Sequence, residues 1–143
     1  MKIQFAHVLV GTALVFVPLV IGAAFGNPNQ RVQRHGWVIM VKPEKIEEYK
    51  RLHAAVWPGV LNKLRECNVR NYSIYLKELE HGKFYLFSYL EYIGTDFDRD
   101  MAKMAADPET QRWWDVTKPC QQQIPLHGEN EWWSTMDEAF HME

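Results

Sequence analysis

Two runs rich in aromatic and β-branched residues stand close together in the middle of the chain, and they limit the possible folds most strongly. The first covers 71–77 (NYSIYLK) and the second covers 84–92 (FYLFSYLEY). Between them lies His81-Gly82-Lys83, a sequence typical of a turn. Strands joined by so short a connection pair side by side and run in opposite directions. The sequence therefore predicts an antiparallel hairpin.

Segments on either side of this hairpin complete a pattern of alternating strands and helices. Pro58 begins one predicted helix, and Asp107 caps another that starts at Pro108, because proline suits the first helical position. In chain order the other predicted elements are a strand at 36–41, helices at 44–57, 58–66, 96–106 and 108–117, and an edge strand in the latter part of 131–142. The order β-α-β-β-α-β predicts an α+β fold, the split βαβ arrangement of ferredoxin-like domains.

The strands at 36–41 and 84–92 are apolar at nearly every position. A sheet with helices on one face and water on the other carries alternating apolar and polar residues. Continuous apolarity therefore predicts that both faces are covered. The sheet of a second copy can cover the free face, which gives a homodimeric α/β barrel, or the aromatic strands enclose a ligand cavity within one subunit.

The first 26 residues differ from the rest of the chain. Lys2 is the only charge, an apolar stretch follows from Val8 to about Ala24, and small residues end it. This pattern predicts a secretory signal peptide over 1–26, with an uncleaved membrane anchor as the alternative. Residues 27–34 then form a polar linker, and 35–143 form one domain. The protein is accordingly expected to be exported, periplasmic or secreted, or held at the membrane if the segment is retained.

Charge and cysteine content exclude several classes of partner. The net charge is −2 and there is no basic run, so the sequence does not indicate binding to nucleic acid or to an anionic membrane surface. Cys67 and Cys120 lack the spacing of a zinc or redox motif, so no metal site is predicted. Whether these two cysteines form a disulfide is left open.

Five residues are candidates for catalysis or ligand binding. Tyr49 and His53 are spaced i, i+4, so they are neighbours on one face of the helix at 44–57. Histidine suits proton transfer near neutral pH, although one on an inward face is also a common core residue. Trp113, Trp114 and Tyr72 offer flat aromatic faces for a sugar, or they pack in the core. Four other histidines, His35, His81, His127 and His141, lie in loops or at strand ends and are expected to be solvated.

Several landmarks resemble the L-rhamnose mutarotase family when they are taken in order. They are EEYKRLHAAVWPGVLNKL, RNYSIYL, QRWW and WWSTMDEAFH, and the resemblance covers Arg34 to His141. It departs from many relatives at Gly59, which follows Trp57-Pro58 where they carry Glu. Since any one landmark is weak, the specificity lies in the ordered set.

The resemblance implies a cofactor-free isomerase that interconverts the anomers of L-rhamnose or a related 6-deoxyhexose. It implies His53 as the proton donor and acceptor, with Tyr49, Tyr72, Trp113 and Trp114 contacting the monosaccharide. It also implies a homodimer and requires no metal or organic cofactor. Two alternatives stay open: a sugar-binding module without catalysis, and a dimeric α/β barrel related to monooxygenases and haem-degrading proteins.

Overall fold

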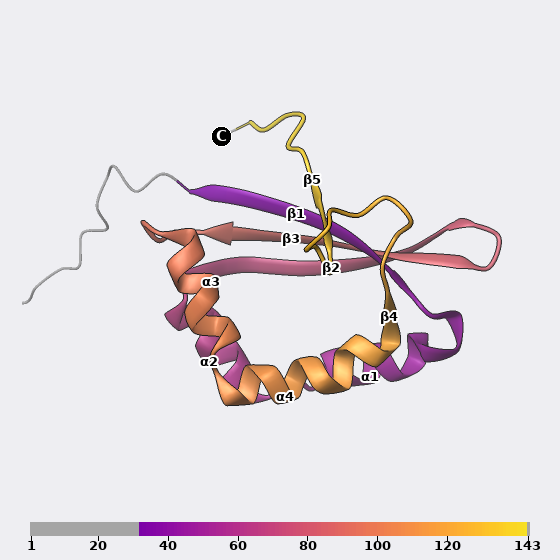
Figure 1. Ribbon diagram of the computed structural model, residues 1–143, viewed down its shortest axis with the longest axis horizontal. Coiled ribbons are helices and arrows are strands. Elements are labelled where there is room, and N and C mark those ends of the chain that lie inside the picture. Colours follow the sequence, from indigo (N-terminus) through magenta and orange to yellow (C-terminus); the bar gives the residue numbers. More distant parts are fainter. Residues whose placement is uncertain (1–31, 143) are drawn as a thin grey trace, which may run out of the picture.

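One antiparallel sheet forms the upper layer of the molecule in the computed structural model, which describes residues 32–142 (Figure 1). Its strands are β1 (Gln33–Val41), β2 (Val69–Glu80), β3 (Lys83–Tyr92), β4 (Gln121–Gln122) and β5 (Ser134–Met136). The sheet order is β2-β3-β1-β4, and β5 also pairs with β1. The predicted signal peptide, and residues 27–31 of the predicted linker, lie outside the described residues.

Helices cover one face of this sheet (Figure 1). They are η1 (Pro43–Lys45), α1 (Ile46–Ala54), α2 (Pro58–Glu66), α3 (Phe97–Ala105), α4 (Pro108–Thr117) and η2 (Lys118–Cys120). The α+β, ferredoxin-like arrangement is therefore confirmed. Within residues 32–142, no helix is both long enough and apolar enough to cross a membrane.

The predicted hairpin is present, and it is longer than the sequence suggested. β2 runs from Val69 to Glu80 and pairs with β3 along most of that length. Gly82 turns the chain with a φ of 73°, a left-handed conformation that glycine adopts without strain. The hydrophobic pattern did not predict the end of β2, because the residues there are charged. Backbone pairing with β3 keeps them in the strand.

The two proline-initiated helices begin where the sequence predicted. α2 starts at Pro58, and α4 starts at Pro108 after Asp107, whose side chain accepts a hydrogen bond from the backbone N–H of Thr110. The end predicted for the helix at 44–57 is wrong, since α1 ends at Ala54. Trp57 is extended, with φ −60° and ψ 135°, because the residue before a proline avoids the helical region.

The predicted linker and the C-terminal region also need small corrections. β1 begins at Gln33, so the last two residues of the predicted linker, 33–34, belong to the strand. The short strand β4 was missed because Gln121 and Gln122 carry no hydrophobic pattern; their pairing with β1 alone defines it. A strand is present near the C-terminus, but it lies at Ser134–Met136, earlier than the latter part of 131–142 in which it was predicted.

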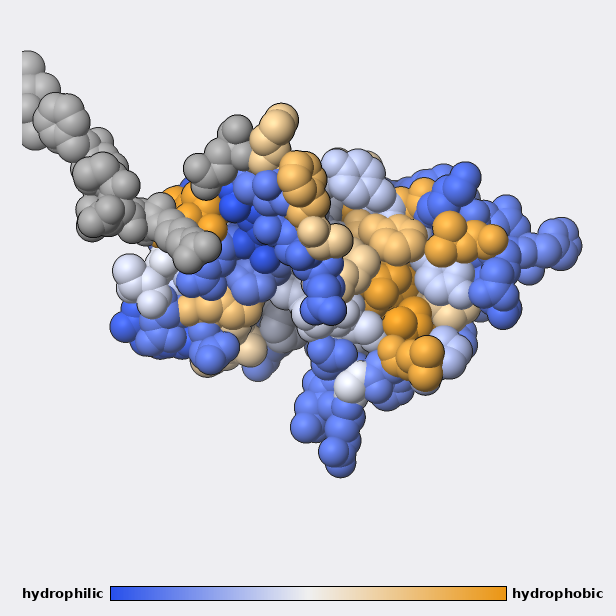
Figure 2. Space-filling model, turned by 90° about the horizontal axis from the view of Figure 1, so that it is seen from above, coloured by the Kyte–Doolittle hydropathy of each residue, from blue (hydrophilic) through white to orange (hydrophobic). Residues whose placement is uncertain are grey.

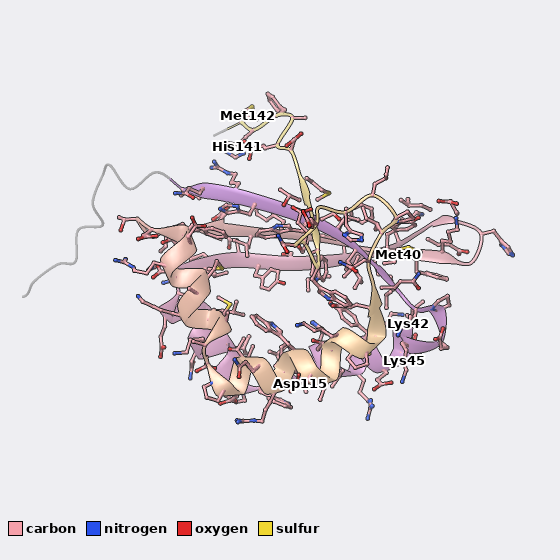
Figure 3. All side chains as sticks on the ribbon, viewed as in Figure 1. Met40, Lys42, Lys45, Asp115, His141 and Met142 are labelled. Atoms are coloured by element: carbon pink, nitrogen blue, oxygen red, sulfur yellow. The ribbon has the colours of Figure 1, made fainter. Side chains whose placement is uncertain are left out.

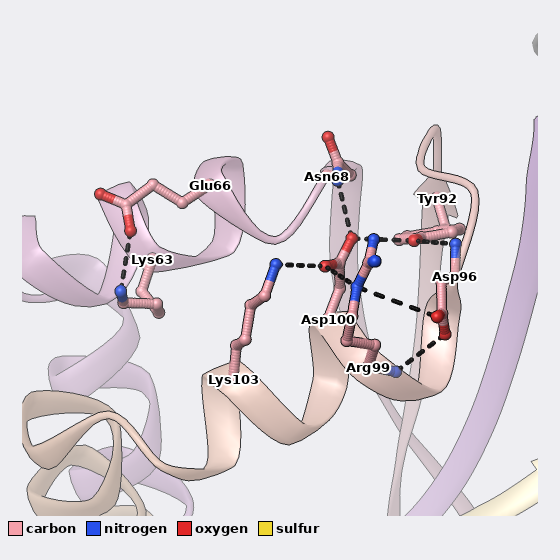
Figure 4. A network of polar contacts seen from close by, with 8 residues as sticks. All are labelled: Lys63, Glu66, Asn68, Tyr92, Asp96, Arg99, Asp100 and Lys103. Carbon is pink, nitrogen blue, oxygen red and sulfur yellow. Dashed lines mark hydrogen bonds and ion pairs between the residues drawn. The ribbon is translucent and has the colours of Figure 1, made fainter.

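A buried carboxylate fixes α3 against the ends of β2 and β3 (Figure 4). Asp100 is 1% exposed and accepts hydrogen bonds from Asn68 Nδ2 at 2.7 Å, Tyr92 Oη at 2.8 Å and Lys103 Nζ at 3.0 Å. These contacts, that from Asn68 foremost, lower the pKa of Asp100 to about 2. A fully paired buried charge holds its element in one position, here the helix that carries Met101 and Met104.

The hydrophobic core is divided into two clusters rather than one. The first contains Ile39, Val41, Tyr49, Leu86 and Cys120, with Trp133 packed against it. The second contains Cys67, Val69, Leu90, Tyr92 and Met104, with Trp37, Leu64 and Met101 packed against it. Cys67 and Cys120 therefore belong to different clusters, and both are buried and unpaired. The division leaves room between the sheet and the helices.

Candidate functional site

A cavity of about 630 Å³ lies between the sheet and the helices, and residues of both core clusters line it. Its walls are mainly aromatic and aliphatic, with a few polar side chains among them. Such a composition is usual for a small-molecule site, where apolar walls give contact area and a few polar groups fix orientation. All five residues singled out from the sequence line this one cavity: Tyr49, His53, Tyr72, Trp113 and Trp114.

The contact between Tyr49 and His53 is built by consecutive turns of α1. Their ring centroids are 4.1 Å apart with an interplanar angle of 28°, so the two rings stack. Tyr49 is 5% exposed and His53 is half-buried. The i, i+4 spacing on the sheet-facing side of the helix produces this pair directly, as the sequence predicted.

The hydrogen bonding of His53 determines which ring nitrogen is free. Nδ1 lies 3.0 Å from the carbonyl oxygen of Tyr49, and a carbonyl oxygen can only accept, so Nδ1 carries a proton. The neutral ring therefore presents the lone pair of Nε2, and the protonated ring presents an N–H there. Burial lowers the pKa of His53, and the hydrogen bond to the Tyr49 carbonyl opposes that effect. A neutral base is thus favoured near pH 7.

The hydroxyl of Tyr49 is a buried polar group without a partner. It makes no hydrogen bond to any of the residues that the structure describes. Burial raises the pKa of Tyr49, the nearby Tyr72 raises it further, and the Gln121 side chain opposes both. Since buried hydroxyls are almost always hydrogen-bonded, this group is available to a ligand in the cavity.

Trp113 and Trp114 have different environments, as their adjacent positions on α4 require. Trp113 is 6% exposed and meets His53 edge to face, with ring centroids 5.3 Å apart. Trp57 packs against its other side at 5.5 Å. Trp114 is half-buried, and Lys118 Nζ lies 5.5 Å from its ring centroid. Trp113 therefore supports His53, while Trp114 offers more of its surface to the cavity. Asp115, next along α4, points away from the sheet (Figure 3).

A β-bulge brings Tyr72 to the cavity. Arg70 pairs with Glu91 and Ser73 pairs with Tyr89, so β2 carries one extra residue over this step. Asn71 occupies it with a φ of 47°, a left-handed conformation that asparagine tolerates. The extra residue turns Tyr72 to the helix-covered side together with Ile74. The side chain of Tyr72 is 44% exposed, so it lies at the edge of the site.

Sequence reasoning missed part of the cavity wall. Trp132 and Trp133 were not among the five candidates; Trp133 packs against a core cluster, and both residues line the cavity. Other lining residues that were not singled out are Trp37, Ser88, Leu64, Met101, Met104, Lys118 and Gln121. The aromatic content of 13%, with six Trp, was the available signal, but it does not say which rings meet.

One of the other histidines is not solvated as expected. His35 stacks between Trp37 and Phe97, with centroid distances of 5.4 and 4.1 Å, and burial lowers its pKa. The predicted strand began at Gly36, just after His35, whereas β1 begins at Gln33 and includes this histidine. By contrast, His141 lies on the C-terminal segment beyond the sheet, away from the helices (Figure 3).

Gly59 lies beside a carboxylate. The side-chain carboxylate of Glu109, from α4, occupies the space where a side chain at position 59 would begin. α2 begins at Pro58 with glycine as its second residue. An acidic group near the first turn of α2 suits the positive end of the helix dipole.

The described residues contain no group of three or more His, Cys, Asp or Glu side chains placed to hold a metal ion. Among residues 32–142, the functional groups that line the cavity are one imidazole, several hydroxyls, one amide, the amine of Lys118 and aromatic surfaces. These groups can exchange protons with a small polar ligand and can hold it by stacking and hydrogen bonds.

Comparisons with known proteins point in one direction. The sequence model of a family described as L-rhamnose mutarotase matches residues 34–142. An L-rhamnose mutarotase from Oceanobacillus iheyensis is 30% identical over 113 residues, covering 78% of this chain and all of that protein. One from Bacillus subtilis is 35% identical over 88 residues, covering 62% and 79% of the two chains.

The fold has a counterpart among solved structures. The crystal structure of an L-rhamnose mutarotase from Formosa agariphila matches with a TM-score of 0.58 and 23% sequence identity. The match covers 78% of this chain and 99% of that one. At this level of identity the likeness concerns the arrangement of strands and helices.

Proposed function

The chain belongs to the L-rhamnose mutarotase family, and we propose that it interconverts the α and β anomers of L-rhamnose or a related 6-deoxyhexose. One observation carries the proposal beyond family membership. His53 stands in an aromatic cavity with Nδ1 bound to a backbone carbonyl and Nε2 without a hydrogen-bond partner among the described residues. That is the arrangement a base needs if it is to accept a proton and return it.

The reaction requires two proton transfers and no net change in composition. The anomeric hydroxyl loses its proton to neutral His53 at Nε2 while the ring oxygen gains one, and the bond between C1 and the ring oxygen breaks. The open aldehyde turns about the C1–C2 bond, and the ring closes on its other face with both transfers reversed. Because the pKa of Tyr49 is raised, its hydroxyl keeps its proton, and a water molecule suits the second transfer better.

The cavity suits a 6-deoxy sugar for two reasons. Stacked and edge-on aromatic rings contact the apolar C–H faces of a pyranose, and the Tyr49 hydroxyl offers a hydrogen bond to a sugar hydroxyl. Leu64, Met101 and Met104 belong to one apolar cluster and line the cavity, so the wall they form favours a methyl group over a hydroxymethyl group. Burying that polar hydroxyl without a partner would cost binding.

Optical rotation tests the activity and the choice of sugar. Crystalline α-L-rhamnose is dissolved, and the relaxation of its rotation is followed with and without the purified protein. We expect a faster relaxation for L-rhamnose than for L-mannose, which differs by carrying a hydroxymethyl group instead of the methyl. A protein that accelerates neither L-rhamnose nor L-fucose would contradict the proposal.

We also propose that two copies pair through the sheet face opposite the helices. On that face Tyr75, Phe87 and Val38 form a row across β2, β3 and β1. Tyr75 is 65% exposed, an unusual exposure for so large a side chain in a sheet. Figure 2 looks onto this face, where hydrophobic side chains gather between hydrophilic margins. A second sheet packed here would form the dimeric barrel expected from the sequence.

Sedimentation velocity of the Phe87→Glu variant tests this pairing. A charge in the middle of the row is expected to weaken the dimer by about 30-fold or more, as loss of a central interface residue does. Leu126→Glu is the matched control, since Leu126 is 89% exposed in the connection between β4 and β5. A wild-type protein that sediments as a monomer at micromolar concentration would contradict the proposal.

Export is the third proposal, supported by the composition of residues 1–26. We expect the mature protein to begin after Gly26, which the intact mass of protein recovered from outside the cytoplasm measures directly. Replacing Leu19 by Arg within the apolar stretch should retain the protein inside the cell. Recovery of uncleaved chain from the cytoplasm of wild-type cells would refute export.

A further inference from the structure

Gln121 is a buried amide on the wall of the cavity. It stands in β4 opposite Val41 of β1, it is 6% exposed, and it lines the cavity together with Tyr49. Its neighbour Gln122 is exposed, because successive residues of a strand face opposite sides. Two glutamines in adjacent positions thus have very different environments, and only the first meets the site.

The orientation of the Gln121 amide is fixed by Trp132. The indole Nε1–H of Trp132 donates a hydrogen bond of 2.7 Å to Gln121 Oε1. An indole nitrogen can only donate, so it selects the amide oxygen and excludes the flipped orientation. The Nε2 group of Gln121, with its two N–H donors, is left for another partner. Trp132 itself is 38% exposed and lines the cavity.

The hydroxyl of Tyr49 is a polar group close to this amide that needs a partner. It is buried and makes no hydrogen bond with the described residues, and Gln121 lies close enough to affect its pKa. The two groups face the same cavity close to one another, and no hydrogen bond of normal length joins them, so a third polar group can bridge them. A hydroxyl can do so, because it accepts from an N–H and also donates or accepts with a phenol.

We propose that Gln121 Nε2 and the Tyr49 hydroxyl together bind one ring hydroxyl of the substrate, and that Trp132 holds the amide in the donating orientation. The inference rests on the sugar substrate proposed above and adds two residues to its recognition. Because Tyr49 stacks on His53, a hydroxyl bound here places the sugar ring against the imidazole. Gln121 is then a substrate-binding residue, and Trp132 acts through it.

Binding of methyl α-L-rhamnopyranoside, measured by isothermal titration calorimetry, tests this without any turnover. Gln121→Met keeps the length of the side chain but removes its donors, and we expect the Kd to rise about tenfold, the usual effect of losing one good hydrogen bond. Gln122→Met is the matched control and should bind as wild type does. Equal Kd values for wild type and Gln121→Met would overturn the proposal.

The role of Trp132 needs a separate variant. Trp132→Phe keeps an aromatic ring but removes the N–H, so the amide can flip, and we expect the Kd to rise about threefold. In the Gln121→Met background the same change should have no further effect, because it acts through the amide. Fully additive effects would overturn the positioning role. Should Gln121→Met fail to fold, Trp132→Phe alone decides, and an unchanged Kd then refutes the proposal.

The sugar hydroxyl can be identified with monodeoxy analogues of L-rhamnose. Removing the hydroxyl that Gln121 and Tyr49 bind should weaken wild-type binding about tenfold or more, and should weaken binding to Gln121→Met less, because that variant has only the bond to Tyr49 left to lose. If every deoxy analogue is discriminated equally by both proteins, Gln121 binds none of these hydroxyls. Binding that behaves as expected in a protein without mutarotase activity would sink the proposed reaction and leave this inference intact.

Discussion

Replacing His53 by Ala is expected to slow the exchange of L-rhamnose anomers by about 10²- to 10⁴-fold, the usual contribution of a general acid–base residue. His53 is the only imidazole among the residues that line the cavity, and its Nε2 has no hydrogen-bond partner among the described residues. The rate is read from saturation transfer between the two anomeric proton signals. His81→Ala, in the exposed turn of the hairpin, is the control.

His53→Gln separates proton transfer from hydrogen bonding. Glutamine keeps hydrogen-bonding capacity at this position but cannot carry a proton between atoms, so we expect it to be as slow as the alanine variant. Both variants should still bind the methyl glycoside. An exchange rate in His53→Ala within threefold of wild type would exclude His53 as the catalytic residue, and binding without exchange in wild type would favour a sugar-binding module.

The pH dependence of the rate follows from the same residue. Burial lowers the pKa of His53 from 6.5, and the Tyr49 carbonyl only partly offsets this. The neutral ring is the base, so the rate is expected to be fully developed at pH 6.5 and above and to fall as the pH drops through the lowered pKa. The His53→Ala variant should lose this dependence. A fall in rate whose midpoint lies above pH 6.5 would contradict a neutral imidazole as the base.

Replacing Trp113 by Ala is expected to lower the free energy of unfolding by about 3–5 kcal/mol, the range for large aromatic residues in a core. Trp113 is 6% exposed and packs edge to face on both His53 and Trp57. Urea unfolding followed by circular dichroism measures the change. The cavity adjoins this position, so water can enter the space left behind, which places the expected value toward the lower end.

Trp114→Ala is the matched comparison for Trp113. Trp114 is half-buried, so we expect a loss of less than about 2 kcal/mol in unfolding free energy but a weaker binding of sugar. Comparing the two variants thus distinguishes the role of Trp113, which packs against His53, from the role of Trp114, which contacts the ligand. Equal losses of stability in both variants would show that the two rings do not have the different roles their burial indicates.

Local rules explain the elements that the sequence predicted well. Proline fixes the first residue of both α2 and α4 through its backbone, and in α4 the acidic cap Asp107 adds a hydrogen bond, so Pro58 and Asp107-Pro108 were sufficient. The end of α1 depends on a local rule as well, the extended conformation of Trp57 before proline. The prediction followed helical periodicity instead of that rule, and it therefore ended the helix three residues too late.

Long-range pairing explains what the sequence did not predict. β4 exists because Gln121 and Gln122 lie beside β1, and nothing in two glutamines indicates a strand. Alternation along β2 predicted the face on which Tyr72 lies. The bulge at Asn71 was not predicted, because it depends on the register with β3. The Trp132–Gln121 hydrogen bond joins residues eleven positions apart, across a connection without regular periodicity.

The candidate site was predicted in part. The i, i+4 spacing of Tyr49 and His53 gives their contact directly, whereas the meeting of α1, β2 and α4 around one cavity depends on the topology of the whole fold. From the residues alone each of the five had a plausible role in the core. The ordered resemblance to a family selected them together, and the structure places all five on the cavity wall.

Saturation transfer between the anomeric protons of L-rhamnose at equilibrium tests the central claim most directly. The purified wild-type protein should increase the transfer in proportion to its concentration, and methyl α-L-rhamnopyranoside, which cannot open its ring, should suppress the increase by occupying the same cavity. A folded protein that leaves the transfer at its uncatalysed value for L-rhamnose and for L-fucose would contradict the account.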